Sequence, residues 1–261
     1  MAAASFHARS SSLPARSHPL VSEIDEQVCR LRQSQAASTS SSSIGHNLNS
    51  LQGVYDRVDQ LFQLPATQQA LINDQKCFNE LLDGSLRLLD LFSTAKDGLS
   101  QMRESVAQLQ SAIRRKQGGL EGETRRYLKS RKTVIKAIHK VLKGMENKKS
   151  TSSNNVETIA MLKEAESAVA EVLECLLTFI SQSSSKTSSW SLISKLKKVS
   201  TASENEFADV DASLKMNKSS EEVQVHLKNL QPCIQDLEEG VESLFRRLIK
   251  TRASILNIHN L

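Results

Sequence analysis

Apolar residues recur along the middle of the chain at alternating spacings of four and three residues. The run comprises Leu88, Phe92, Ala95, Leu99, Met102, Val106, Leu109 and Ile113. A period of 3.5 places all of them on one stripe of an α-helix, and such a stripe needs another helix to cover it. The pattern extends backwards with misses at Ser85 and Asp74, so we expect one helix from Ala66 to Gln117, about 78 Å long.

A second apolar stripe with the same spacing occupies the C-terminal part of the chain. Its positions are Val223, Leu227, Leu230, Ile234, Leu237, Val241, Leu244, Leu248, Thr251, Ile255 and Ile258, and all but Thr251 are apolar. We expect this helix to pack against the first stripe within the same chain, although a coiled coil between two chains would use the same positions. Pro232 is expected to kink or restart the helix because it lacks a backbone donor.

Shorter amphipathic segments predict further helices before and between these stripes. They span about residues 22–36, 44–64, 123–145 and 155–181. Polar, mostly serine-rich linkers are expected near 38–43, 147–155 and 181–189. The sequence therefore predicts an all-α fold, an elongated helical bundle with long coiled-coil-like helices, as a single domain over residues 20–261. Residues 1–19 contain no acid and few apolar side chains, so we expect a disordered tail there.

The composition agrees with a helical protein. Only 9 Gly and 4 Pro are present and aromatic residues make up 4%, whereas sheet proteins need turn formers and aromatic or β-branched strand residues. No apolar run approaches the roughly 20 residues that a membrane-spanning helix requires. The four cysteines lie far apart with no histidine at ligand spacing, so we expect buried thiols in a reducing compartment.

No constellation for catalysis is recognisable in the sequence. A phosphate-binding glycine loop, a Gly-x-Ser-x-Gly elbow, a His-Glu-x-x-His pair and a zinc spacing are all absent. We therefore predict no catalytic, cofactor-binding or metal-binding residue, no cofactor, no small-molecule substrate and no enzymatic activity.

Positive charge is concentrated in one part of the chain. Between Arg114 and Lys149 there are 13 Lys or Arg against three acids, a net of +10, and because the whole chain carries +5 the remainder carries −5. On the helix expected at 123–145, one stripe opposite the apolar side contains Arg125, Lys129, Lys132, Lys136, Lys140 and Lys143. This stripe is either a solvated outer face or a surface for anionic lipid or an acidic protein. Nucleic acid is the least favoured ligand, because no aromatic residues are interleaved with the basic ones.

The tail contains a candidate phosphorylation and docking motif. Arg9, Ser10, Ser12 and Pro14 fit the pattern R-S-x-S-x-P, which 14-3-3 proteins bind when the second of those serines is phosphorylated. A phosphate on Ser12 would add about −1.5 to −2 charge for arginine side chains to hold. Such motifs also arise by chance in serine-rich segments, and the acid-free tail is compatible with a plastid transit peptide.

Five stretches of the chain resemble a known family. They read SLPARSHPL, LPATQQAL, LLDGSLRLLD, RRYLKSRK and QDLEEGVESLFRRLIKTRASILNI. These stretches are similar to the plant-specific BYPASS-like family of unknown function, and the resemblance extends from Ser12 to Ile258. It implies a land-plant origin, an all-helical fold, an association with root and shoot development, and no catalytic residues.

We accordingly predict a non-enzymatic regulatory or adaptor protein of plant signalling, located in the cytoplasm and binding protein partners. The alternative is a peripheral membrane protein that binds anionic lipid through its basic amphipathic helix.

Overall fold

The structure, a computed structural model, describes residues 18–37, 40–115, 120–146, 157–182 and 205–258. Eight helices make up this described part, and it contains no strand. They are α1 (Pro19–Ala37), α2 (Ser41–Phe62), α3 (Pro65–Asn73), α4 (Gln75–Arg115), α5 (Leu120–Glu146), α6 (Glu157–Ser181), α7 (Glu206–Lys215) and α8 (Ser220–Ile258). The predicted all-α class is confirmed.

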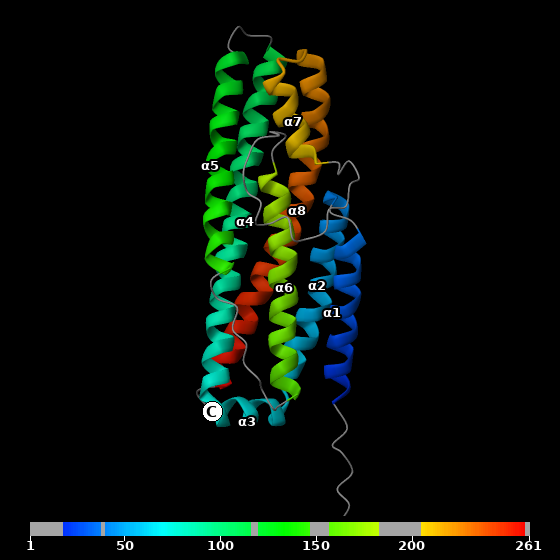
Figure 1. Ribbon diagram of the computed structural model, residues 1–261, viewed down its shortest axis with the longest axis vertical. Helices are drawn as coiled ribbons and strands as arrows, with labels where there is room; N and C mark the ends of the chain where they lie inside the picture. The colour runs from blue at the N-terminus through cyan, green and yellow to red at the C-terminus, as the bar shows by residue number, and fades with distance from the viewer. Residues whose placement is uncertain (1–17, 38–39, 116–119, 147–156, 183–204, 259–261) are drawn as a thin grey trace, which may run out of the picture.

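The long helices run along a common axis and give the molecule an elongated shape (Figure 1). α4 and α8 are antiparallel: Gln110 donates a hydrogen bond to the carbonyl of Leu227 at 3.3 Å, and Arg252 donates to that of Leu82 at 2.6 Å. α5 packs along α4, α2 packs against α6 and α8, α1 covers α2 and α6, and α3 crosses one end of the bundle (Figure 1). One continuous apolar core contains side chains from every one of these helices.

The two apolar stripes are buried against other helices of the same chain, as expected. Every stripe position on α4 from Leu88 to Leu109 is buried, and every stripe position on α8 is buried as well. The rings of Phe92 and Phe245 meet edge to face with 6.5 Å between their centroids. The polar exception, Thr251, is accommodated because its hydroxyl donates to Oδ1 of Asp59 at 2.6 Å.

The single helix expected from Ala66 to Gln117 is wrong. The chain leaves the helical conformation at Asp74, with φ −120° and ψ 80°, so α3 ends before it and α4 starts after it. Oδ1 of Asp74 accepts a hydrogen bond from the backbone N–H of Cys77 at 3.0 Å. This bond satisfies a donor that the first turn of α4 would otherwise leave free. The polar residue at a stripe position thus marks a helix start.

Two helix contacts depend on glycine. A Cβ at Gly98 would lie 3.2 Å from Cγ1 of Val134, and a Cβ at Gly240 would lie 3.1 Å from Cδ1 of Leu48. α4 therefore approaches α5, and α8 approaches α2, more closely than alanine would permit without a shift. This close packing offsets the roughly 1 kcal/mol by which glycine disfavours a helix relative to alanine.

The first helix boundaries differ from those that the sequence predicts. α1 begins at Pro19, inside the expected tail, and proline is well suited to the first position of a helix. α2 begins at Ser41, so the second half of the linker expected at 38–43 is helical. Oγ of Ser40 caps α2 by accepting a hydrogen bond from the backbone N–H of Ser43 at 3.3 Å.

Three further expectations concern Pro232, the cysteines and the linkers. α8 continues through Pro232 without a restart. Of the four thiols expected to be buried, those of Cys77 and Cys233 are buried and that of Cys175 is half-buried. Cys29 is exposed, because it lies beside the buried stripe of α1, one residue after Val28. The linker expected at 147–155 lies outside the described residues, as does most of the one at 181–189.

Candidate functional site

α5 is a helix whose two sides differ in chemistry. Glu121 and Glu123 in its first turn complement the positive end of the helix dipole. Tyr127, Val134 and Ile138 are buried in the bundle. Spacings of seven and four residues keep these three side chains on one face, so the opposite face is turned to solvent.

The opposite face carries the basic stripe expected from the sequence, which we call the α5 basic face. Its six members are all exposed: Arg125, Lys129, Lys132, Lys136, Lys140 and Lys143. At 1.5 Å per residue they extend over about 27 Å. Arg125 makes an exposed ion pair with Glu121 at 2.9 Å, which contributes little, and none of the five lysines pairs with an acid of the described chain.

The α5 basic face is a ridge on the outside of the bundle. α5 packs against α4 and α6, and Figure 1 shows it along one edge of the molecule, away from α1 and α2. The large apolar side chains that are exposed in the described chain lie on or beside other helices: Ile72, Leu86, Met216, Val225, Ile249 and Leu256. The ridge therefore offers charge alone, because the apolar side of this amphipathic helix is already used in the core.

One arginine of α5 points into the bundle instead. Arg131 is only 2% exposed, and its Nε lies 3.1 Å from Oδ2 of Asp211 on α7, whose side chain is equally buried. Arg131 also donates to the carbonyl oxygens of Ile180 and Gln182, the latter at 2.7 Å. These carbonyls lie at the C-terminal end of α6, so the guanidinium satisfies acceptors that the helix leaves free.

The same cluster fixes the start of α7. Asn205 caps this helix by accepting a hydrogen bond from the backbone N–H of Ala208 at 3.0 Å, and its side-chain amide donates to the carbonyl of Phe179 at 2.9 Å. The ring of Phe207 lies against the guanidinium, with 4.9 Å between its centroid and Cζ of Arg131. One buried network therefore joins α5, the end of α6 and α7.

Burial governs the titration of this network. It raises the pKa of Asp211, while the positive charge of Arg131 opposes that rise. Burial likewise raises the pKa of the Tyr127 hydroxyl. The guanidinium is the group that stabilises an ionised Asp211, so removing it would leave a buried, unpaired charge.

The family described as Protein BPS1 matches residues 47–258. The match runs from α2 to the end of α8 and includes the α5 basic face, Arg131 and Asp211. The chain belongs to the BPS1 family. The resemblance indicated by the sequence stretches is thereby confirmed over nearly the whole chain. Neither the curated proteins nor the solved structures give a match to it.

The tail motif of this BPS1-family protein stays a prediction. Arg9, Ser10, Ser12 and Pro14 lie outside the described residues and before the matched region.

A groove of about 760 Å³ lies between α2 and α8, next to the start of α7. The hydroxyl of Ser41 donates to Oε1 of Glu206 there, at 2.5 Å. Burial is the main cause that raises the pKa of Cys233 to about 12. Because the thiolate is the reactive form of cysteine, Cys233 is protonated and unreactive at neutral pH. The groove thus holds a thiol without the activation that nucleophilic catalysis needs.

None of the described helices combines the length and the apolar composition that a membrane-spanning helix requires. The His, Cys, Asp and Glu side chains of the described residues form no group of three or more placed to hold a metal ion.

Sequence reasoning assigned no role to Arg131. It lies four residues after Tyr127 and three before Val134, so it occupies the buried stripe of α5. An arginine at a position of the buried stripe could have predicted a buried ion pair. Its partner Asp211 is 80 residues away in the sequence, and no spacing rule connects the two.

Proposed function

We propose that this BPS1-family protein is a non-enzymatic regulatory adaptor of plant signalling, acting in root and shoot development, that attaches to anionic membrane surfaces through the α5 basic face. The proposal is supported by the row of five lysines on this outward ridge, which are exposed and pair with no acid of the described residues. In this arrangement the bundle stays folded and the ridge meets the lipid head groups.

The shape and chemistry of the ridge favour a membrane over other anionic partners. A convex ridge fits a flat surface, whereas single-stranded nucleic acid is held in grooves with stacking aromatic side chains. Five of the six basic residues are lysines, which act as hydrated point charges, whereas specific phosphate or carboxylate recognition commonly uses the planar fork of arginine. Clusters of this size are typical of segments that bind acidic lipids.

The expected strength follows from the number of charges. Each basic residue near an anionic leaflet contributes about 1 kcal/mol, so five lysines supply at most about 5 kcal/mol. That corresponds to roughly a 10³- to 10⁴-fold gain in partitioning. Because no exposed apolar side chain adds to it, salt should weaken the attachment strongly.

The adaptor part of the proposal rests on what lies away from the ridge. The described groove contains the thiol of Cys233, which burial keeps protonated, and this favours a binding role over catalysis by that thiol. Phosphorylated Ser12 would supply a second contact, with a 14-3-3 protein, through a segment that precedes the bundle.

Co-sedimentation with vesicles tests the membrane proposal. The full chain should sediment at low salt with vesicles rich in phosphatidylserine and remain in solution with vesicles of neutral lipid. A charge-reversed variant should lose this binding; its substitutions are Lys129→Glu, Lys132→Glu, Lys136→Glu and Lys140→Glu.

A matched control distinguishes the effect of the α5 basic face from the effect of net charge. The control variant reverses four other exposed basic residues, giving the same net charge: Arg30→Glu, Lys76→Glu, Lys218→Glu and Lys228→Glu. It should bind more tightly than the α5 variant, while helical circular dichroism confirms that both are folded. Equal loss of binding in the two variants would mean that net charge, and not the α5 basic face, drives attachment.

A further inference from the structure

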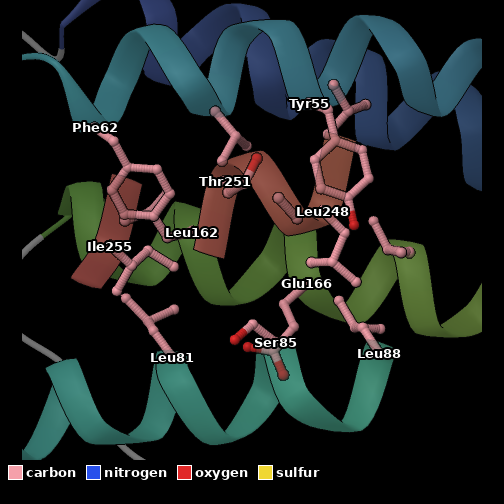
Figure 2. Close-up of a pocket in the computed structure, with 14 residues that line it drawn as sticks. Tyr55, Phe62, Leu81, Ser85, Leu88, Leu162, Glu166, Leu248, Thr251 and Ile255 are labelled. Atoms are coloured by element: carbon pink, nitrogen blue, oxygen red, sulfur yellow. The ribbon is translucent and has the colours of Figure 1, made fainter. Parts of the chain in front are cut away.

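A small, partly open cavity lies where four helices meet. It has a volume of about 50 Å³ and is bordered by side chains of α2, α4, α6 and α8 (Figure 2). Most of the lining is aliphatic, with Leu88, Leu162 and Leu248 among the side chains that border it. The polar exceptions come from all four helices: Tyr55, Ser85, Glu166 and Thr251.

The hydroxyl of Tyr55 is the unusual group in this cavity. Tyr55 is 5% exposed, and among the described residues nothing forms a hydrogen bond with its hydroxyl. Figure 2 shows the ring extending from α2 with the oxygen directed into the space between the helices. A buried hydroxyl without a partner costs about 1–3 kcal/mol, so a partner inside the cavity would be strongly favoured.

The other polar side chains offer acceptors around the same space. Glu166 accepts a hydrogen bond from Arg87 at 3.1 Å through Oε1, and a carboxylate has further acceptor positions. Its side chain runs from α6 toward Ser85 on α4 (Figure 2). The hydroxyl of Ser85 donates to the carbonyl of Leu82 at 2.7 Å and accepts from Arg252 at 2.5 Å.

Glycine makes room for the carboxylate at this position. A Cβ at Gly84 would lie 1.9 Å from Oε1 of Glu166, so the carboxylate occupies space that any other residue would fill. This absence of a side chain lets Glu166 lie against α4 while Arg87 holds it from the solvent side.

The volume limits what the cavity holds. One water molecule needs about 10–15 Å³ on this measure, so there is room for about three to five. An engineered cavity that accepts benzene measures about 150 Å³, which excludes an aromatic ligand here. A purely apolar cavity of this kind would stay dry, but a water molecule with two or more polar partners is stably bound.

We propose that this cavity is a specific hydration site, in which ordered water held by the Tyr55 hydroxyl and the Glu166 carboxylate links α2 to α6. The bound molecules complete the hydrogen bonding of a tyrosine that the protein groups leave unsatisfied. They also solvate the carboxylate from inside the bundle. Burial raises the pKa of Glu166, and internal water limits that rise.

The test compares the wild type with Tyr55→Phe, which removes the hydroxyl and keeps the ring. Tyr127→Phe is the matched control, because Tyr127 is the other buried tyrosine of the chain and does not line this cavity. Crystal structures that show ordered water are determined for all three full-length proteins. We expect water within hydrogen-bond distance of the Tyr55 hydroxyl in the wild type and in Tyr127→Phe, and none at that position in Tyr55→Phe.

A second readout follows the carboxyl carbon of Glu166 by NMR through a pH titration. The charged neighbours of this group are Arg87 and Glu80 on α4 and Lys163 on α6, and all stay unchanged in both variants. Loss of the anchored water should raise the pKa of Glu166 in Tyr55→Phe and leave it unchanged in Tyr127→Phe. A dry cavity in the wild type, a direct bond between Tyr55 and Glu166, or an organic molecule in the cavity would each overturn the proposal.

Discussion

Replacement of Arg131 by methionine tests the buried cluster that joins α5, α6 and α7. Methionine keeps most of the length of the side chain but removes the partner of Asp211 and the donors to the carbonyls at the end of α6. Both charged side chains are 2% exposed, so water cannot replace the lost contacts. The buried carboxylate would then be unpaired.

The size of the effect follows from that burial. Removing one partner of a buried ion pair costs about 3–5 kcal/mol. Folded domains are stable by only about 5–15 kcal/mol, so this is a large share of the total. If the free energy of unfolding falls by about 3 kcal/mol per molar urea, the urea concentration at the unfolding midpoint should fall by about 1 to 2 M. Adding Asp211→Leu should restore much of the loss, because an apolar pair of similar size avoids the desolvation cost.

Urea unfolding followed by circular dichroism measures the change, with hydrogen exchange reporting on α7 separately. Arg126→Met is the control: this arginine is 74% exposed on the same helix, and its replacement should change stability by less than about 0.5 kcal/mol. The loss in Arg131→Met should shrink on acidification, because the raised pKa of Asp211 lets the unpaired carboxylate become neutral. A wild-type midpoint together with unchanged exchange in α7 would refute the structural role of the cluster.

Three further predictions concern separate parts of the chain. Burial raises the pKa of Glu166 in the folded protein. The contribution of this carboxyl group to stability is therefore complete below its unfolded pKa of about 4.3, and it is lost as the pH rises through its pKa in the folded state. Glu166→Gln should raise the melting temperature more at pH 7 than at pH 4, and an equal change at both pH values would contradict this. Gly122→Ala, where nothing lies within 4 Å of the new Cβ, should stabilise the protein by about 1 kcal/mol, whereas Gly84→Ala should not, because its Cβ would meet Glu166. A peptide of residues 8–18 should bind a plant 14-3-3 protein only when Ser12 is phosphorylated, and equal weak binding of both forms would make the motif a coincidence.

The long helices of this fold could be predicted from the sequence, because their buried positions repeat at regular spacing. The stripes on α4 and α8 were readable since burial recurs every three or four residues, and the same periodicity placed Lys132 and Lys136 on the outer side of α5. The break at Asp74 was missed because one side-chain hydrogen bond to a backbone N–H outweighed an otherwise continuous pattern.

Features that depend on contacts between distant residues were not accessible in this way. The pairing of Arg131 with Asp211 requires α7 to pack beside α5, and no spacing of residues within either helix predicts this packing. The approach of Glu166 to Gly84 is of the same kind: the glycine resembles a weak point of α4 until the side chain from α6 is seen to occupy its place.

We propose that the α5 basic face attaches the folded bundle to anionic membranes by charge alone. The most direct test is the affinity of the full chain for phosphatidylserine-rich vesicles over a series of salt concentrations. We predict tight binding at low salt that falls steeply as the screening length shrinks toward about 8 Å at physiological ionic strength. Binding that does not change with salt, or no binding at the lowest salt, would contradict the claim.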